Sequence, residues 1–385
     1  MNDQATESVL TLPPPIASAP AVAPLVVAVE ATRLAREVRG IGRYVRALLP
    51  RLIALRPGLR LELYVKRQRD IDALAPGFAD PVYGGRVSLH RVRSMTSSRA
   101  DVFWYPWNVA APIPSRGAVV VTMHDVVPIA HPDPRRIRGF QKNLRWRRRY
   151  ATTARHATLI IADSQFTADE VHRMLGVPYE RMRVVLLAAD DFAVPPAAGD
   201  AEALARLGVA RPFVLAVGAA DRRKNLELLE RAMPRVVASL PEVSLVLAGP
   251  RRDPHAAQPD ASWRKPVGFV SDEELAALYR SASVLVMPST YEGFGLPVLE
   301  AMQLGTPVIS TRASSLPEVG GDAALWIDPD DDVALAERIV AVMTEPARAA
   351  AMRAASLAQS ARFSWDETAR RTISTFEDAL AVVGR

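Results

Sequence analysis

The 385-residue sequence contains no cysteine. This absence excludes a disulfide framework, a thiolate nucleophile and a cysteine-based metal site, and it fits a reducing compartment. No apolar run approaches the roughly 20 residues that are needed to span a bilayer. Residues 1–24 have no basic residue and no unbroken apolar core, so they do not match a signal peptide, and their composition predicts a disordered tail. We therefore expect a cytoplasmic protein.

Acidic residues are absent from one stretch, which runs from Arg135 to Arg149 and holds eight basic residues. The net charge of the whole chain is +6, so the remainder is close to neutral. A basic segment of this kind favours an anionic surface or ligand. Ile137, Phe140, Leu144 and Tyr150 recur in it at near-helical spacing. The segment is read either as an ordinary amphipathic surface helix or as a helix that lies on anionic lipid headgroups or meets a lipid diphosphate.

Apolar residues make up 49% of the sequence, and its length is comfortable for two domains. Apolar strand-like runs alternate with segments of helical spacing, which predicts parallel, doubly wound α/β sheets. A linker rich in Pro and Ala at 194–200 places the domain boundary near residue 195. Capping-box patterns predict helix starts at Thr167 and Ser271. Further helices are expected over 331–344 and 365–382.

Two carboxylates and two glycines follow one apolar run, within the segment 288–302. Glu292 lies beside Gly293 and Gly295, and Glu300 follows eight positions after the first carboxylate, in a predicted helix. A strand, a glycine loop and a helix N-terminus present free backbone N–H groups at the carboxyl edge of a parallel sheet. We expect an anionic ligand there, with the carboxylates holding its hydroxyl groups. The alternative is a pair of surface carboxylates at a helix start.

A basic loop follows another predicted strand of the same half. Gly218 leads into Arg222, Arg223 and Lys224. Arginine offers a planar fork to a phosphate and lysine a point charge, so this loop suits a phosphate group. The alternative is a solvated basic turn.

The first half places His124 and Asp125 directly after a strongly apolar strand, where side chains of an open α/β sheet face the ligand crevice. A histidine satisfied by local hydrogen bonds is the alternative. Gly40 and Gly42 precede a helical segment, and turn formation with close packing explains them equally well. The aromatic residues at 104, 105 and 107 are read as core and interdomain packing, or as a platform for a sugar or lipid.

These motifs together resemble the signature of the retaining glycosyltransferase family 4. The resemblance covers residues 25–380 and implies the GT-B architecture, in which two Rossmann-like domains face each other across a cleft. Residues 25–195 would form the acceptor-side domain and residues 196–364 the nucleotide-sugar-binding domain, while the segment 365–385 would cross back to the first domain. The resemblance rests on the motifs Gly40-Ile-Gly-Arg-Tyr44, His124-Asp125, Asp163-Ser-Gln-Phe166, Arg223-Lys-Asn225, Glu292-Gly-Phe-Gly-Leu-Pro297 with Glu300, Gly305-Thr-Pro-Val308 and Leu316-Pro-Glu-Val-Gly320.

The resemblance also implies roles for single residues. Glu292 would contact the hydroxyl groups of the donor sugar, and His124 would touch the transferred sugar. Glu300 would bind the ribose, while Arg223 and Lys224 would hold the diphosphate. The remaining donor-binding positions would be Gly40, Gly42, Gly218, Phe269, Val270, Phe294, Gly295 and Leu296.

One position departs from the family, because Ala219 stands where many relatives carry an arginine after the glycine of the diphosphate loop. Phosphate charge must then rest on Arg222, Arg223 and Lys224. No Asp-x-Asp motif is placed to hold Mg²⁺, so we expect neither a metal nor another cofactor. Fixed cations and helix N-termini can stabilise the leaving diphosphate. Retention in this family is discussed as front-face substitution, which needs no strong nucleophile.

The resulting hypothesis is a glycosyltransferase that moves a hexose from a nucleotide diphosphate sugar to a glycan or lipid-linked glycan in cell-surface polysaccharide synthesis. The preferred donor is GDP-mannose, and UDP- or dTDP-linked glucose or rhamnose are alternatives. A basic nucleic-acid-binding protein is the competing class, but the chain has no recognition module and its charge excess lies in one segment, so no nucleic-acid partner is expected. A catalytically silent sugar-binding relative is a third alternative, and the intact carboxylate pair argues against it.

Overall fold

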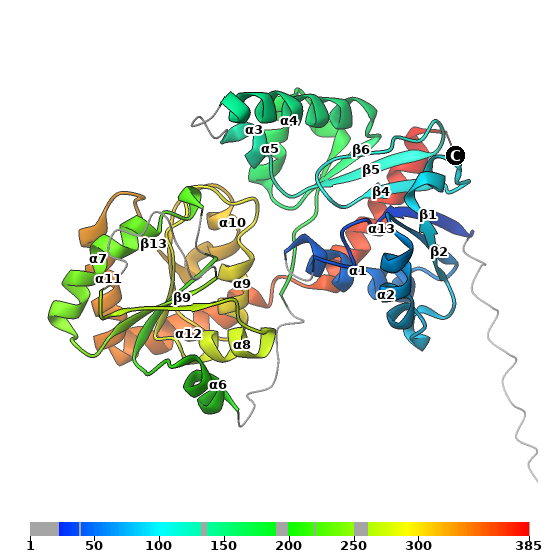
Figure 1. Cartoon of the computed structure of the whole chain (residues 1–385). Helices are drawn as coiled ribbons and strands as arrows, with labels where there is room; N and C mark the ends of the chain where they lie inside the picture. Colours follow the sequence, from blue (N-terminus) through cyan, green and yellow to red (C-terminus); the bar gives the residue numbers. More distant parts are fainter. Residues whose placement is uncertain are drawn as a thin grey trace, which may run out of the picture.

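The computed structural model describes residues 23–37, 40–131, 137–189, 199–218, 221–249 and 261–384, with the backbone alone for residues 137–142. Its strands form two separate sheets, and helices surround each of them (Figure 1). The two sheets define the first and the second domain. The expected boundary near residue 195 lies outside the described residues.

The first domain contains a seven-stranded sheet in the order β3-β2-β1-β4-β5-β6-β7. All of its strand pairs are parallel. The order reverses between β1 and β4, which is the switch point where open α/β sheets bind their ligands. Its strands are β1 (Leu25–Glu30), β2 (Leu59–Val65), β3 (Val87–Arg91), β4 (Val102–Tyr105), β5 (Ala118–Met123), β6 (Leu159–Ala162) and β7 (Met182–Val184).

The second domain contains a six-stranded sheet in the order β10-β9-β8-β11-β12-β13, again with parallel pairs. Its switch point lies between β8 and β11. The prediction of two doubly wound, Rossmann-like domains is confirmed. The strands are β8 (Phe213–Val217), β9 (Ser244–Ala248), β10 (Arg264–Gly268), β11 (Val284–Met287), β12 (Val308–Thr311) and β13 (Ala324–Ile327).

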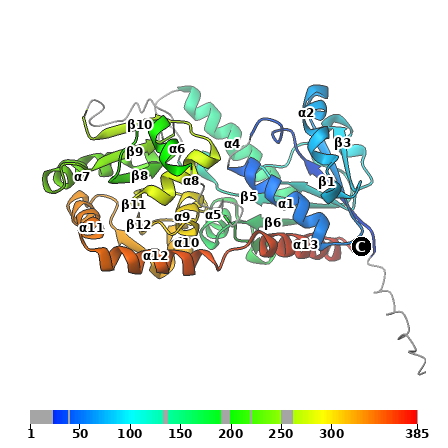
Figure 2. The ribbon, with the colours of Figure 1, turned by 90° about the horizontal axis from the view of Figure 1, so that it is seen from below.

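Helices cover both faces of each sheet, as Figures 1 and 2 show together. They are α1 (Ile41–Leu55), α2 (Gln68–Phe78), α3 (Val127–Ala130), α4 (Ile137–His156), α5 (Gln165–Leu175), α6 (Asp200–Leu207), α7 (Leu226–Ser239), α8 (Asp272–Ser281), α9 (Leu296–Gln303), α10 (Leu316–Gly320), α11 (Asp332–Thr344), α12 (Pro346–Ser360) and α13 (Trp365–Val382). A short 3₁₀ turn, η5, covers Arg222–Lys224.

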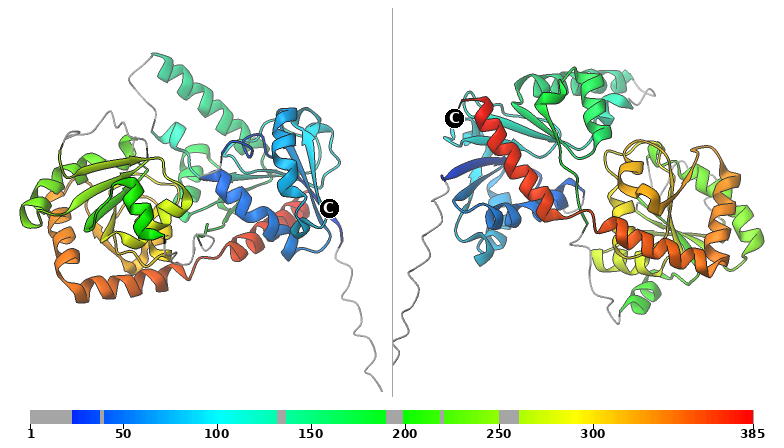
Figure 3. Two further views of the ribbon diagram at one scale, coloured as in Figure 1. Left: turned by 60° about the horizontal axis from the view of Figure 1, so that its bottom comes forward. Right: turned by 180° about the vertical axis from the view of Figure 1, so that it is seen from behind.

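Helix α13 leaves the second domain at the end of α12 and lies along the first domain (Figure 3). Its Phe376 ring meets the Trp104 ring edge-on at 5.7 Å between centroids, and its Trp365 lies 6.2 Å from Tyr44. The Thr368 hydroxyl donates to the carbonyl of Leu186 at 2.7 Å. The last helix of the chain therefore completes the core of the first domain.

The aromatic residues of β4 and of the loop that follows it belong to the core. Trp104 and Tyr105 are fully buried, and Trp107 is 3% exposed. The indole N–H of Trp104 donates to Thr122, and that of Trp107 donates to the carbonyl of Glu30. The packing interpretation of these residues is therefore correct, and they offer no platform to a sugar.

Two helix starts were predicted from capping boxes, and one of them was wrong. Ser271 caps α8 together with Glu274, as predicted. Helix α5, however, begins at Gln165, and its cap is Ser164, whose hydroxyl accepts from the backbone N–H of Thr167 at 3.0 Å. Thr167 already lies in the first turn of the helix, because the strand β6 ends only two residues before Ser164.

Candidate active site

A cavity of about 430 Å³ lies between the two domains, at the carboxyl ends of their strands. Nine of the predicted site residues line it. Four others, Gly42, Arg223, Lys224 and Val270, do not belong to its lining. The nine are Gly40, His124, Gly218, Phe269, Glu292, Phe294, Gly295, Leu296 and Glu300.

The loop between β11 and α9 forms one wall of this cavity. Gly295 is the residue before α9 and has a φ of 110°, a left-handed conformation that favours glycine. A Cβ atom there would also approach Leu316 to 2.9 Å. The Ser315 hydroxyl bonds to the carbonyl oxygens of Glu292 and Phe294 at 2.9 and 2.8 Å. The loop is therefore held in place by its own domain, with the N-terminus of α9 facing the cavity.

Glu292 pairs with a cation from the basic loop. Its Oε1 lies 2.7 Å from Nζ of Lys224, and both side chains are largely buried. Arg223, by contrast, donates to the Asp221 carboxylate and to the carbonyl of Tyr291. Burial raises the pKa of Asp221, but the hydrogen bonds and charge of Arg223 more than offset it, and the pKa falls below its ordinary value. Lys224 thus pairs with Glu292, while Arg223 holds its own loop through Asp221 and Tyr291.

Glu300 on α9 is held from both domains. Arg43 of α1 reaches across from the first domain, with its Nη1 atom 2.8 Å from Oε1 of Glu300. The Tyr279 hydroxyl donates to the other oxygen at 2.9 Å. Arg43 also lines the cavity, so a guanidinium of the first domain lies beside the carboxylate expected to bind a ribose.

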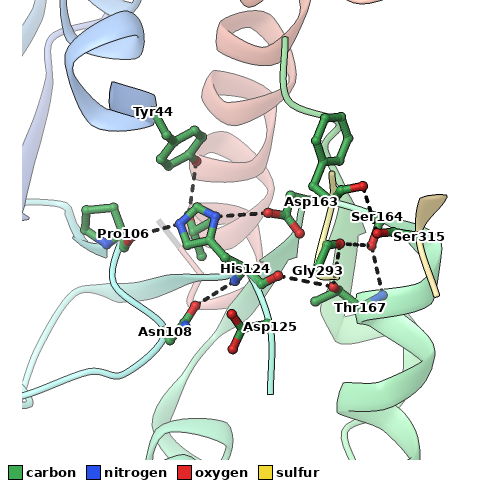
Figure 4. Close-up of polar contacts among 12 residues, drawn as sticks. Tyr44, Pro106, Asn108, His124, Asp125, Asp163, Ser164, Thr167, Gly293 and Ser315 are labelled. Atoms are coloured by element: carbon green, nitrogen blue, oxygen red, sulfur yellow. Dashed lines mark hydrogen bonds and ion pairs between the residues drawn. The ribbon is translucent and has the colours of Figure 1, made fainter. Parts of the chain in front are cut away.

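His124 is buried, and protein groups occupy both of its ring nitrogens (Figure 4). Nδ1 lies 3.0 Å from Oδ2 of Asp163, and Nε2 lies 3.0 Å from the carbonyl oxygen of Pro106. Burial lowers the pKa of His124, but the bond and charge of Asp163 more than offset this effect, so the pKa is raised. Both ring nitrogens are therefore engaged by protein groups, and neither is free to act as a general base.

The carboxylates of Asp163 and Asp125 both lie beside His124 in the sequence or in space. Burial raises the pKa of Asp163 to about 6. The hydrogen bond to His124 lowers this pKa and so offsets part of the effect of burial. Burial also raises the pKa of Asp125, whose Oδ1 accepts from the N–H of Val127 at 3.0 Å. Both carboxylates line the cavity.

The two glycines of the first domain differ in their roles. Gly42 lies inside the first turn of α1, where a Cβ atom would come within 1.7 Å of the carbonyl oxygen of Glu37. Close packing therefore explains Gly42. Gly40 precedes the helix with a φ of +57°, has open space beside it, and lines the cavity.

The sequence of the chain is similar to those of known proteins. The family described as Glycosyltransferase Family 4 matches residues 38–191, and Glycosyl transferases group 1 matches residues 211–345. O-antigen chain mannosyltransferase B of Escherichia coli is 32% identical over 276 residues, which cover 67% of this chain and 70% of that protein. The chain belongs to glycosyltransferase family 4.

The chain is also similar to a second mannosyltransferase in sequence and to a solved structure in fold. The serotype-specific mannosyltransferase WbdA of Escherichia coli is 32% identical over 237 residues, which cover 58% of this chain but only 29% of that protein. The structure of Anabaena HepE in complex with UDP and glucose superimposes with a TM-score of 0.70 at 18% identity, covering 92% of this chain and all of that one. The latter similarity confirms the GT-B fold.

Several residues in or beside the interdomain cavity received no role from the sequence. Arg43 and Asp163 stand inside motifs that were recognised, but their partners lie far away in the chain. Tyr279 had no local signal at all. Among the residues that the structure describes, no group of three or more His, Asp or Glu side chains is arranged to hold a metal ion.

The basic segment forms most of α4, which projects from the first domain (Figure 3). Arg145, Arg147 and Arg148 are exposed, and so is Leu144. The first basic residues of the segment, at 135 and 136, lie outside the described residues. No described helix combines the length and the apolar character that crossing a membrane requires.

Proposed function

We propose that this glycosyltransferase moves mannose from GDP-mannose, with retention of configuration, to a glycan or lipid-linked oligosaccharide in cell-surface polysaccharide synthesis. The observation that carries the proposal is the arrangement of Glu292 and Glu300 in one interdomain cavity. Each carboxylate is paired with a cation, and the two flank the N-terminus of α9. The mannosyltransferases among the relatives support the choice of sugar.

The cavity suits the departure of a diphosphate. In the proposed step, the acceptor oxygen forms a bond to C1 of the sugar while the bond from C1 to the phosphate oxygen breaks. The acceptor proton passes to the departing phosphate oxygen. Arg43 and the N–H groups at the start of α9 line the cavity, and Lys224 reaches its edge through Glu292; together these groups would stabilise the negative charge that gathers on the leaving group. The protein then supplies positioning and charge rather than a nucleophile.

Residues near the sugar support a front-face reaction. His124 has both nitrogens engaged, so its imidazole is not free to act as a nucleophile or base. Glu292 is the proposed contact for the sugar hydroxyl groups, and Glu300 for the ribose. Fixed cations take the role that Mg²⁺ has in other transferases, so we propose that the reaction needs no metal. Activity that survives excess chelator is the expected result.

The test is release of nucleotide diphosphate from sugar donors by the purified protein. We expect GDP release from GDP-mannose and a loss of about 100-fold or more in kcat for Glu292→Ala, because charge stabilisation at the reacting sugar is removed. Glu337→Ala, which removes an exposed carboxylate on α11, is the matched control. Normal turnover by Glu292→Ala would overturn the assignment of this carboxylate.

The donor base is tested separately with a thermal-shift series of GDP, UDP and dTDP. A ligand that binds only the folded protein raises its melting temperature in proportion to affinity and concentration. We expect GDP to give the largest shift. A larger shift with UDP would favour a UDP-sugar instead, in line with the ligands of HepE.

We further propose that the protein works in the cytoplasm, at the inner face of the membrane. A lipid-linked acceptor would be presented there. The exposed arginines of α4 would contact anionic headgroups and bring the cleft to the acceptor.

A further inference from the structure

The start of helix α5, in the first domain, is capped by the second domain. A helix leaves its first backbone N–H groups without partners inside the helix. Here the N–H of Gln165 and that of Phe166 donate to the two oxygens of the Glu318 carboxylate, each at 2.7 Å. Glu318 lies on α10, more than 150 residues further along the chain. A negative charge of one domain thus sits on the positive end of a helix of the other.

A second contact lies beside the first one. The hydroxyl groups of Ser164 and Thr167 donate to the carbonyl oxygen of Gly293, at 2.6 and 3.1 Å (Figure 4). Gly293 has no room for a side chain, because a Cβ atom would lie 1.8 Å from the carbonyl oxygen of His124. The backbones of the two domains therefore touch at this glycine.

Both contacts are adjacent to residues of the proposed reaction. Gly293 follows Glu292 directly in the chain. On the other side, Ser164 follows Asp163, whose carboxylate holds His124. The start of α5 thus joins the sugar-side carboxylate of one domain to the histidine of the other.

We propose that Glu318 is a positioning residue, which holds the cleft closed so that Glu292 and His124 face the same donor sugar. The effect of Glu318 on catalysis rests on the proposed function, whereas its effect on closure of the cleft does not. Glu318 is half-buried and does not line the cavity, so it acts through α5 and not on the substrate.

Contacts of this kind are weak enough for a reversible closure. A carboxylate at a helix N-terminus shifts an equilibrium by about twofold to thirtyfold, depending on burial. Such a bias favours the closed arrangement and still lets the cleft open for donor entry and product release.

The test measures the distance between the domains directly. The chain has no native cysteine, so spin labels attach only at Arg69→Cys on α2 and Arg235→Cys on α7, two exposed positions in different domains. Glu318→Gln keeps the size of the side chain and removes its charge. Glu318→Asp is one methylene shorter, and Glu318→Lys reverses the charge. Glu337→Gln loses the same charge on an exposed face of the second domain and serves as the control.

We expect Glu318→Gln to raise the ratio of open to closed molecules by about twofold to thirtyfold. The distribution of distances between the labels should then shift toward longer values. The lysine variant should open further and the aspartate variant less. In the transfer assay, kcat should fall by a similar factor, with a smaller change in the donor KM, since the altered residue does not touch the donor.

An unchanged distance distribution in Glu318→Gln and Glu318→Lys would overturn the inference, whatever the wild-type activity. A wild-type protein that releases nucleotide from no sugar donor would overturn the proposed function instead, and the distances would then decide the role of Glu318 in closure. A fall in kcat equal in Glu337→Gln and Glu318→Gln would assign the effect to net charge and would also overturn the inference.

Discussion

Arg43 reaches from one domain into the other, and its Nη1 atom lies 2.8 Å from Oε1 of Glu300. The Tyr279 hydroxyl holds the second oxygen. The carboxylate proposed for the ribose is therefore oriented by protein groups from both sides. Each carboxylate oxygen has two acceptor sites, so ribose hydroxyls can share Glu300 with these partners.

Glu300→Gln should weaken donor binding more than it slows the chemical step. The ribose is remote from the reacting bond, and a hydrogen bond to a charged group contributes about 1.5–3 kcal/mol. We expect KM for the donor to rise by about 10- to 100-fold with little change in kcat, as measured by steady-state kinetics. Tyr279→Phe, which removes a hydroxyl that orients Glu300 and does not line the cavity, is the comparison. If it raises KM as much as Glu300→Gln, the orientation of the carboxylate and not a ribose contact accounts for the effect.

Gly293→Ala should disrupt the closed cleft. Its Cβ atom would overlap the carbonyl oxygen of His124, so the domains must separate or shift. We expect a loss of at least about tenfold in kcat/KM, because small displacements of reacting groups are costly. Gly77→Ala is the control, since Gly77 has open space around it within α2, where alanine favours the helix. Equal activity of the two variants would contradict the close approach at Gly293.

The pair of His124 and Asp163 should make stability depend on pH. The pKa of His124 is raised in the folded protein above 6.5, and burial raises that of Asp163 to about 6 from 3.8. The folded state thus holds protons more tightly than the unfolded chain. The stabilisation from His124 is complete below its unfolded pKa and is lost as the pH rises through the raised pKa, and the contribution of Asp163 is lost as the pH rises through about 6.

This dependence can be measured by urea unfolding from about pH 5 to pH 8. The difference in unfolding free energy between the wild type and Asp163→Asn should shrink as the pH rises, by about 1.4 kcal/mol for each unit of pKa shift. Asp72→Asn, at an exposed position of α2, should show no such trend. A difference that grows with pH would contradict the tighter binding of protons by the folded pair.

Replacing the arginines of α4 at positions 145, 147, 148 and 149 by glutamine should reduce binding to anionic liposomes. Each basic residue near a negative surface contributes about 1 kcal/mol, so the loss should be large at low salt. The control replaces four exposed arginines of the second domain, Arg206, Arg231, Arg235 and Arg348, by the same residue. Equal sedimentation of both variants with liposomes would exclude a specific membrane face on α4.

Most of the predictions made from the sequence came from local motifs. The loop around Glu292 and Gly295 and the strand that ends at His124 were recognisable because strand, loop and helix start are consecutive in the chain. The ion pair of Arg43 with Glu300 was not predictable in this way, since it joins residues of two domains. The same holds for Glu318, whose partners are backbone N–H groups and carry no sequence signal of their own.

One helix was missed and one helix start was misplaced for local reasons. Helix α12 is rich in alanine and has no strong apolar stripe, so periodicity did not reveal it, although alanine has the highest helix propensity. The cap of α5 was assigned to Thr167 because the capping-box pattern also fits there. Ser164 forms the cap, since β6 ends only two residues before it.

The path of α13 has a consequence for folding during synthesis. The chain passes from the first sheet to the second and then returns, so the second domain is an insertion within the first. Tyr44 packs against Trp365 of α13, and Trp104 packs against Phe376 of the same helix. The domain that is made first must therefore wait for the last helix to be synthesised, and the inserted domain can complete its own sheet before the earlier one closes its core.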